Sequence, residues 1–186
     1  MSNTAEFDEF VRVARSVLDG FVAARLTDDA LVEATDRLRE VAAILDEHRM
    51  SDEDLLGSHR PNAPGRGLLL MPPYRLDRVD RSGLEGTVTF PVHFLGGAAA
   101  HGGALPLFFD QILGMMTNRG EGPVARTAWL KTTYRKIVPL DVPIRIEASL
   151  DSRDGRKRMA SARLMLDGVV LSDAEGLFIE LAPGQA

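Results

Sequence analysis

The residues with the clearest chemical potential lie between Ala98 and Gly114, in the run AAAHGGALPLFFDQILG. Gly102 and Gly103 follow His101 and come directly before an apolar segment. Glycines before a helix let backbone N–H groups point outward, where they can bind an anion or stabilise an oxyanion. The apolar segment carries one acid, Asp110. A carboxylate among apolar residues is costly to desolvate, so its presence indicates a function.

The segment after the glycines is predicted to be a helix that begins near Gly103 or Ala104. Pro106 fits only in the first turn, because proline lacks an N–H group and its φ is fixed. From Ala104 to Met116 nearly every residue except Asp110 is apolar. A helix that is apolar on nearly every face is typical of a buried helix. We therefore expect Asp110 to lie on a buried helix.

This pattern resembles that of the PaaI-like hotdog-fold acyl-CoA thioesterases. The likeness rests on HGG and on an acid nine positions after the histidine, within a hydrophobic helix. It extends over Asn62–Leu181 and includes the run TAWLKTTYRKIVPL at Thr127–Leu140 and the terminal strand LFIEL. The resemblance implies an α+β hotdog fold, in which an antiparallel sheet wraps around a long central helix.

The resemblance also implies catalytic roles. Asp110 would be the general base or the nucleophile of thioester hydrolysis, and the sequence does not separate the two. Gly102, and with it Gly103, would offer N–H groups to the carbonyl oxyanion at a helix N-terminus. His101 would shape the loop by hydrogen bonding, with action as a base as the alternative. The Thr127 hydroxyl would orient the water or the carboxylate. The structural alternatives are a capping carboxylate, glycines that only permit a turn, and an ordinary strand threonine.

A second group of residues would bind the substrate. Multiply charged CoA phosphates need several cations near a pocket mouth, which basic residues on two segments could supply; a solvated basic face is the alternative. A tyrosine seven positions after Thr127 keeps the family register, and an apolar segment before Pro72-Pro73 commonly lies along the acyl channel in the family. The candidates are Met71, Tyr134, Arg135, Lys136, Arg156, Lys157 and Arg158.

One position departs from the family pattern, and two other functions remain open. Leu95 stands where some relatives have an asparagine, six positions before the histidine, that holds the attacking water. His93 and Asp110 faintly match the histidine and acid of hotdog dehydratases or hydratases that act on hydroxyacyl thioesters. A protein that binds acyl-CoA without turnover is the other alternative. The four histidines are scattered and cysteine is absent, so no metal site is indicated.

The N-terminal part is predicted to be a helical hairpin. Apolar residues recur at helical spacing from Phe7 to Phe21, and Thr27-Asp28-Asp29 is typical of the start of a second helix, which continues to about His48. Packing or oligomer contact is the expected role of this hairpin. We expect a helical extension over residues 1–56, a Gly- and Pro-rich linker over 57–67 and the hotdog thioesterase domain over 68–183.

The strands of the hotdog domain are predicted from a change in the apolar pattern, in which apolar and polar residues begin to alternate. Alternation from Leu84 to Phe94 predicts one strand leading into the glycine turn. Four antiparallel strands are expected after the helix, and Asp167-Gly168 favours a two-residue hairpin turn. These four are Val124–Ile137, Ile144–Leu150, Ala160–Leu166 and Val169–Leu181.

The whole chain sets further limits. Its 186 residues and formal charge of −5 give no general electrostatic argument for nucleic acid or an anionic membrane. With no cysteine, disulfides and thiolate catalysis are excluded, and no apolar run reaches membrane length. We expect a cytoplasmic enzyme without metal or redox cofactor, whose substrate carries coenzyme A. Gly102 and Asp110 would lie about 12 Å apart along one helix, so we expect a homodimer with shared active sites, or a homotetramer built from it.

Overall fold

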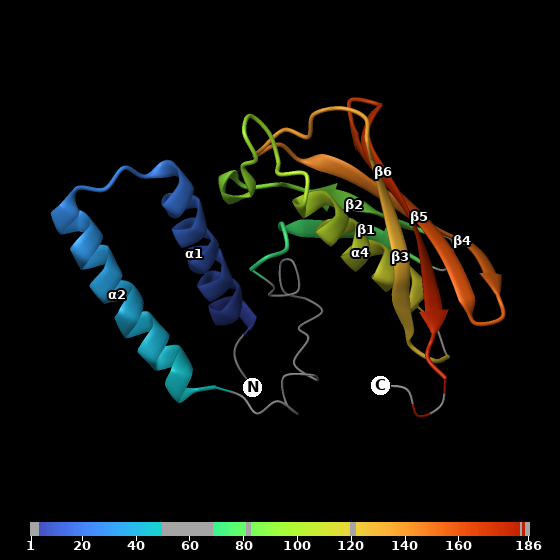
Figure 1. Cartoon of the computed structure of the whole chain (residues 1–186), viewed down its shortest axis with the longest axis horizontal. Coiled ribbons are helices and arrows are strands. Elements are labelled where there is room, and N and C mark those ends of the chain that lie inside the picture. Colours follow the sequence, from blue (N-terminus) through green and yellow to red (C-terminus); the bar gives the residue numbers. More distant parts are fainter. Residues whose placement is uncertain (1–3, 50–68, 81–82, 120–121, 183, 185–186) are drawn as a thin grey trace. The chain divides into compact units, whose positions relative to one another are not determined.

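The computed structural model describes residues 4–49, 69–80, 83–119, 122–182 and 184 (Figure 1). The chain divides into two compact units, residues 1–67 and 68–186. The first unit contains α1 (Thr4–Ala23) and α2 (Asp28–Glu47). The predicted linker at 57–67 lies outside the described residues.

Both N-terminal helices form where the periodicity predicts them. Thr27 caps α2, because its hydroxyl accepts a hydrogen bond from the N–H group of Ala30 at 3.3 Å. The carboxylates of Asp28 and Asp29 in the first turn interact favourably with the positive end of the helix dipole. No residue of α2 is buried. The apolar stripe that identifies α2 in the sequence therefore stays exposed in the single chain.

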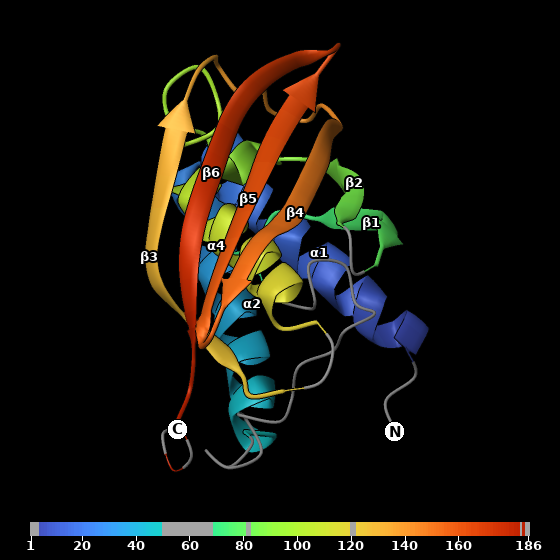
Figure 2. The same cartoon turned by 90° about the vertical axis from the view of Figure 1, so that its right-hand side faces the viewer.

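The second unit is an antiparallel sheet with α4 (Ala104–Thr117) against one face (Figures 1 and 2). The described residues form six strands in the order β1-β2-β4-β5-β6-β3, with β1 and β3 at the two edges. This arrangement confirms the predicted hotdog fold. The strands are β1 (Tyr74–Val79), β2 (Leu84–Val88), β3 (Ala125–Tyr134), β4 (Ile144–Asp154), β5 (Lys157–Leu166) and β6 (Val169–Glu180).

Two strands precede α4, whereas the sequence pattern predicts one. Half of the residues of β1, YRLDRV, are charged, so the sequence lacks the apolar alternation that would predict a strand. β1 lies at the edge of the sheet, where these charges remain in solvent. The strand expected to reach Phe94 ends at Val88, and Val92–Phe94 form a short 3₁₀ helix, η2. Pro91 cannot donate a ladder hydrogen bond, so the regular strand stops before it.

The predicted hairpin turn between β5 and β6 is confirmed. Asp167 and Gly168 have φ angles of 50° and 78°. Positive φ at both central residues is the requirement of a type I′ turn, which matches the twist of the flanking strands.

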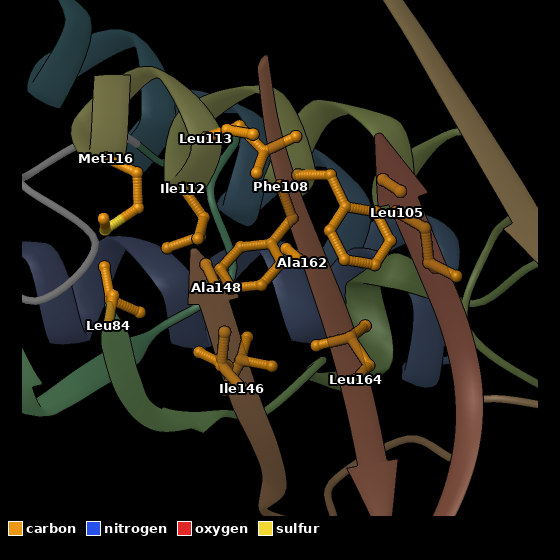
Figure 3. Close-up of a cluster of buried hydrophobic side chains, with 14 of the residues drawn as sticks. Leu84, Leu105, Phe108, Ile112, Leu113, Met116, Ile146, Ala148, Ala162 and Leu164 are labelled. Atoms are coloured by element: carbon orange, nitrogen blue, oxygen red, sulfur yellow. The ribbon is translucent and has the colours of Figure 1, made fainter. Parts of the chain in front are cut away.

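The hydrophobic core lies between α4 and the sheet. Figure 3 shows side chains of α4, such as Phe108 and Ile112, meeting Ile146 of β4 and Leu164 of β5. All four of these side chains are fully buried. The apolar alternation of the strands therefore faces the helix and fixes its position on the sheet.

One face of α4 is open, contrary to the prediction of a helix buried all round. Leu107 is 41% exposed, and Asp110, one turn further along, is also exposed. The sheet covers the opposite face, where Phe108, Phe109 and Ile112 lie. Leu107 is therefore only partly covered within the described chain, and the expected desolvation of Asp110 does not occur in a single copy.

Candidate active site

Asp110 is held by strand β3. The hydroxyl of Thr127 donates a hydrogen bond to Oδ1 of Asp110 at 2.7 Å. A bulge follows Thr127, because the pairing of β3 with β6 shifts between Thr127 and Trp129. Among the described residues no partner contacts the second carboxylate oxygen of Asp110. One oxygen is thus oriented by the threonine while the other is available for chemistry.

The glycine turn is closed by its own histidine. The N–H group of Gly103 donates to Nδ1 of His101 at 3.0 Å, and the N–H group of Ala104 donates to the His101 carbonyl at 2.9 Å. The Gly103 N–H group is therefore engaged, which removes it as an oxyanion donor in this conformation. The N–H group of Gly102 has no partner among the described residues and is the remaining donor of the turn.

Tyr134, at the far end of β3, contacts the same turn. Its phenol hydroxyl donates a hydrogen bond to the Gly102 carbonyl at 2.9 Å. The prediction placed Tyr134 among the substrate-binding residues. In the structure its hydroxyl hydrogen is used within the chain, so β3 contacts Asp110 through Thr127 and the glycine turn through Tyr134.

Gly96 is a residue of this site that the sequence analysis missed. A Cβ at position 96 would lie 2.5 Å from the Cα of His101, too close for any side chain. The backbone bonds from Gly96 N–H to Ala99 and from His101 N–H to Phe94 fold this loop back on itself. The pair Gly96-Gly97, five residues before the HGG run, is the signal that could have identified it.

Arg158 does not reach the surface. Its side chain is 4% exposed and donates to the Glu180 carboxylate and to the carbonyls of Thr117 and Pro123. This burial corrects the prediction that Arg158 meets the phosphates of CoA. The guanidinium instead joins β5, β6 and the C-terminal end of α4, where its positive charge interacts favourably with the negative end of the helix dipole.

The other basic candidates form two separate groups. Arg135 pairs with Asp173, whose neighbours Ser172 and Ala174 are buried, so this pair lies on the sheet face turned away from α4. Lys136 follows it and is exposed. Arg156 and Lys157 lie in the β4–β5 hairpin, where Lys157 pairs with Ile179 of β6. Because Arg135 is bonded beside Leu171 of β6, the two groups are about 26 Å apart along the strand.

Three further candidates have clear positions. Met71, expected along an acyl channel, is buried at 6% exposure before β1. Leu95 pairs through its backbone with Ala100, beside the glycine turn, and its exposed side chain has no polar group to hold a water. His93 in η2 stacks on Phe94 with ring centroids 4.4 Å apart, and its Nε2 atom is buried. A buried Nε2 argues against His93 as the acid–base group of a dehydratase.

A hollow of about 730 Å³ lies elsewhere, on the charged outer face of the sheet. Ion pairs such as Lys131–Glu175 and Arg163–Glu147 line it, and it includes none of the candidate catalytic residues. In the described part of the chain no three histidine or acidic side chains are placed to hold a metal ion. Among the same residues no helix is long and apolar enough to cross a membrane.

The comparison with known proteins supports the expected family. No family model matches the chain. A crystal structure of protein RHA08564, a thioesterase superfamily protein, matches 93% of this chain and 94% of its own, with a TM-score of 0.77 and 29% identity. The chain therefore has the hotdog fold of a thioesterase superfamily protein. The resemblance read from HGG and Asp110 is therefore confirmed.

Two further proteins are similar to part of the chain. The acyl-coenzyme A thioesterase THEM4 of Bos taurus is 36% identical over 85 residues, which make up 45% of this chain. The match spans 34%, about a third, of that curated relative. The PaaI protein from the phenylacetic acid degradation operon of E. coli has the same fold, with a TM-score of 0.54 and 14% identity over 59% of this chain and 80% of its own.

Proposed function

We propose that the protein is an acyl-CoA thioesterase, which converts an acyl-CoA and water to a free acid and CoA. The observation that carries the proposal is that the chain has both an N–H group in the glycine turn without a partner among the described residues, at Gly102, and a carboxylate oriented by Thr127, at Asp110. Thioester hydrolysis needs these two groups: a donor for the carbonyl oxyanion and a carboxylate that activates water or attacks. The similarity to THEM4, named as an acyl-coenzyme A thioesterase, supports this choice of substrate.

In the proposed reaction the thioester carbonyl oxygen accepts a hydrogen bond from Gly102. Asp110 removes a proton from water as the water attacks the carbonyl carbon, or the carboxylate attacks and forms an anhydride that water opens. In both cases the carbon–sulfur bond breaks, and the CoA thiolate leaves and takes up a proton. A single turnover in H₂¹⁸O separates the two routes, because label in the Asp110 carboxylate marks the anhydride.

Each site is proposed to form between two copies of the chain. Gly102 and Asp110 are about 12 Å apart along α4, too far to act together on one carbonyl group. In one chain Tyr134 at the end of β3 contacts Gly102, and Thr127 near its start contacts Asp110. If two β3 edges pair antiparallel, the end of one strand lies beside the start of the other. That pairing brings Gly102 of one copy toward Asp110 of the second.

The same pairing explains the distribution of the basic residues. Lys136 lies near the Gly102 end of β3, while Arg156 and Lys157 lie near the Asp110 end. A shared site would therefore have Lys136 of one copy and the hairpin cations of the second on its rim. Several cations at one mouth are what the phosphates of CoA require.

The test is a thiol-release assay with acyl-CoAs of graded chain length, together with aryl-CoAs. We expect CoA release that is lost in Asp110→Asn. Hydration of an enoyl-CoA without CoA release would identify a hydratase instead. Tight acyl-CoA binding with no release from any substrate would identify a binding protein, and either outcome would refute the proposal.

A further inference from the structure

The glycine turn presents one donor because its other polar groups are already bonded. The carbonyl of His101 accepts from Ala104 N–H at 2.9 Å. The carbonyl of Gly102 accepts from Tyr134, and the N–H group of Gly103 donates to His101. These last two groups are the two ends of the same peptide unit. The Gly102–Gly103 peptide is thus held at its oxygen and at its nitrogen.

This double attachment has a conformational consequence. A peptide unit is planar, so fixing its oxygen and its N–H group fixes the orientation of the whole plane. The Gly102 N–H group lies in the preceding His101–Gly102 peptide, whose oxygen accepts from Ala104. Glycine otherwise samples a wide range of φ and ψ, so holding the plane that follows Gly102 limits the rotation of Gly102 and with it the direction of its N–H group. His101 holds one end from within the turn. Tyr134 holds the other end from β3, which pairs with β6 at Tyr134 opposite Ser172.

We propose that Tyr134 is a positioning residue, whose hydroxyl fixes the glycine turn so that the Gly102 N–H group points at the substrate carbonyl. The inference rests on the proposed thioesterase function and replaces the substrate-binding role predicted for Tyr134. Thr127 on the same strand orients Asp110, so β3 positions both of the groups that a turnover requires.

The geometry favours positioning over direct contact with substrate. The Tyr134 ring lies 3.7–3.9 Å from the place where a Cβ of Gly102 would stand. Its hydroxyl hydrogen is already donated to the Gly102 carbonyl. A residue that acts through the turn should affect the chemical step, whereas a residue that binds substrate uniformly should affect KM.

The first test is Tyr134→Phe, which removes only the hydroxyl. A hydrogen bond of this kind corresponds to a fall in kcat of about 3- to 10-fold, with KM for acyl-CoA within about twofold of wild type. Thr133→Val is the matched control, because it removes a neighbouring hydroxyl that lines the outer face of the sheet, and it should change neither parameter. A raised KM with unchanged kcat in Tyr134→Phe would overturn the inference.

The second test does not depend on activity. Amide hydrogen exchange followed by NMR should show the Gly103 N–H group protected in the wild-type protein and faster to exchange in Tyr134→Phe, with equal stability toward urea. Unchanged Gly103 exchange would overturn the link between Tyr134 and the turn. If the wild-type protein releases no CoA, the proposed function fails, and the exchange measurement still decides whether Tyr134 fixes the turn.

Discussion

At the scale of single residues, three glycines around His101 lack a side chain for different reasons. A Cβ at Gly96 would lie 2.5 Å from the His101 Cα, and a Cβ at Gly103 would lie 3.1 Å from its Nδ1. A Cβ at Gly102 would meet only the Tyr134 ring, at an ordinary 3.7 Å, and Gly102 is not in the left-handed region. The fold therefore needs glycine at 96, whereas a methyl group at 102 would make only an ordinary contact with the Tyr134 ring.

The glycines should separate stability from activity. Gly102→Ala should fold with a Tm close to wild type and lose about 10²-fold in kcat/KM, because the methyl group narrows the approach to the Gly102 N–H group. Gly96→Ala should lower the unfolding free energy by about 1–3 kcal/mol, because its methyl group overpacks against His101. Thermal denaturation and thiol release on both variants measure this. Equal Tm losses in the two would contradict the distinction.

The second prediction at this scale concerns Asp110. Asp110→Asn should reduce kcat by about 10²-fold or more, which is the range of general-base catalysis. Because Asp110 is exposed in the single chain, its replacement should change the unfolding free energy by less than about 1 kcal/mol. Asp77→Asn, which removes a surface carboxylate on β1, is the control and should keep full activity. A folded Asp110→Asn protein with a native rate would exclude Asp110 from the mechanism.

At the scale of elements, a cluster around the buried Arg158 joins four of them. Arg158 on β5 donates to Glu180 on β6 and to the carbonyl of Thr117, the last residue of α4. Arg153 on β4 donates to the same carboxylate. The hydrogen bonds from Arg158, and then from Arg153, hold the pKa of Glu180 below its ordinary value of 4.5.

This cluster predicts a pH dependence of stability. A carboxyl group with a lowered pKa in the folded state stabilises the fold above its unfolded pKa, and this contribution is lost as the pH falls through the folded pKa. The difference in unfolding free energy between wild type and Glu180→Gln should thus be full at neutral pH and shrink below about pH 4.5. Urea unfolding across this range measures it. A difference independent of pH would show that the charge of Glu180 contributes nothing.

The β4–β5 hairpin gives a prediction on substrate binding. Neutralising Arg156 and Lys157 to glutamine should raise KM for acyl-CoA with little change in kcat, the signature of uniform binding. A pantetheine thioester, which lacks the nucleotide, should show a smaller effect. Arg163→Gln, on the outer sheet face, is the control for the loss of one positive charge. Equal effects on both substrates would argue against contact with the phosphates.

At the scale of the whole molecule, a single copy leaves two neighbouring features uncovered. β3 is an edge strand of ten residues without proline, and such edges tend to pair with another strand. Beside it, α4 exposes Leu107 and Asp110. A twofold contact through β3 would cover both features, and it would make the catalytic unit a pair of chains.

Mixed dimers test this arrangement. A chain with Asp110→Asn and a chain with Gly102→Ala should each be inactive alone, since every site in either homodimer lacks one group. A dimer that contains one of each has one site with both groups intact and should recover about half of the wild-type activity per dimer. Two different affinity tags isolate the mixed species. Purified mixed dimers as inactive as their parents would refute a shared site.

Much of this protein is determined locally in the sequence. The helical periods of the N-terminal region, the cap at Thr27 and the Asp167-Gly168 turn depend on neighbouring residues, and the structure has all three where they were expected. The alternation of the later strands identifies the core face for the same reason. The HGG run and Asp110 could also be identified, because their spacing along one helix is a property of the chain itself.

The tertiary structure alone decided what depends on pairing between distant segments. β3 lies beside β6 at the sheet edge, although β4 and β5 separate them in the sequence, and no local pattern reports strand order. The same long-range pairing places Arg158 beside Glu180 and buries a cation that looks like a surface residue in sequence. It also brings Tyr134 to the Gly102 carbonyl, 32 positions away, and leaves one face of α4 open. Hydrogen bonds and burial depend on which residues are neighbours in space, and the fold determines these neighbours.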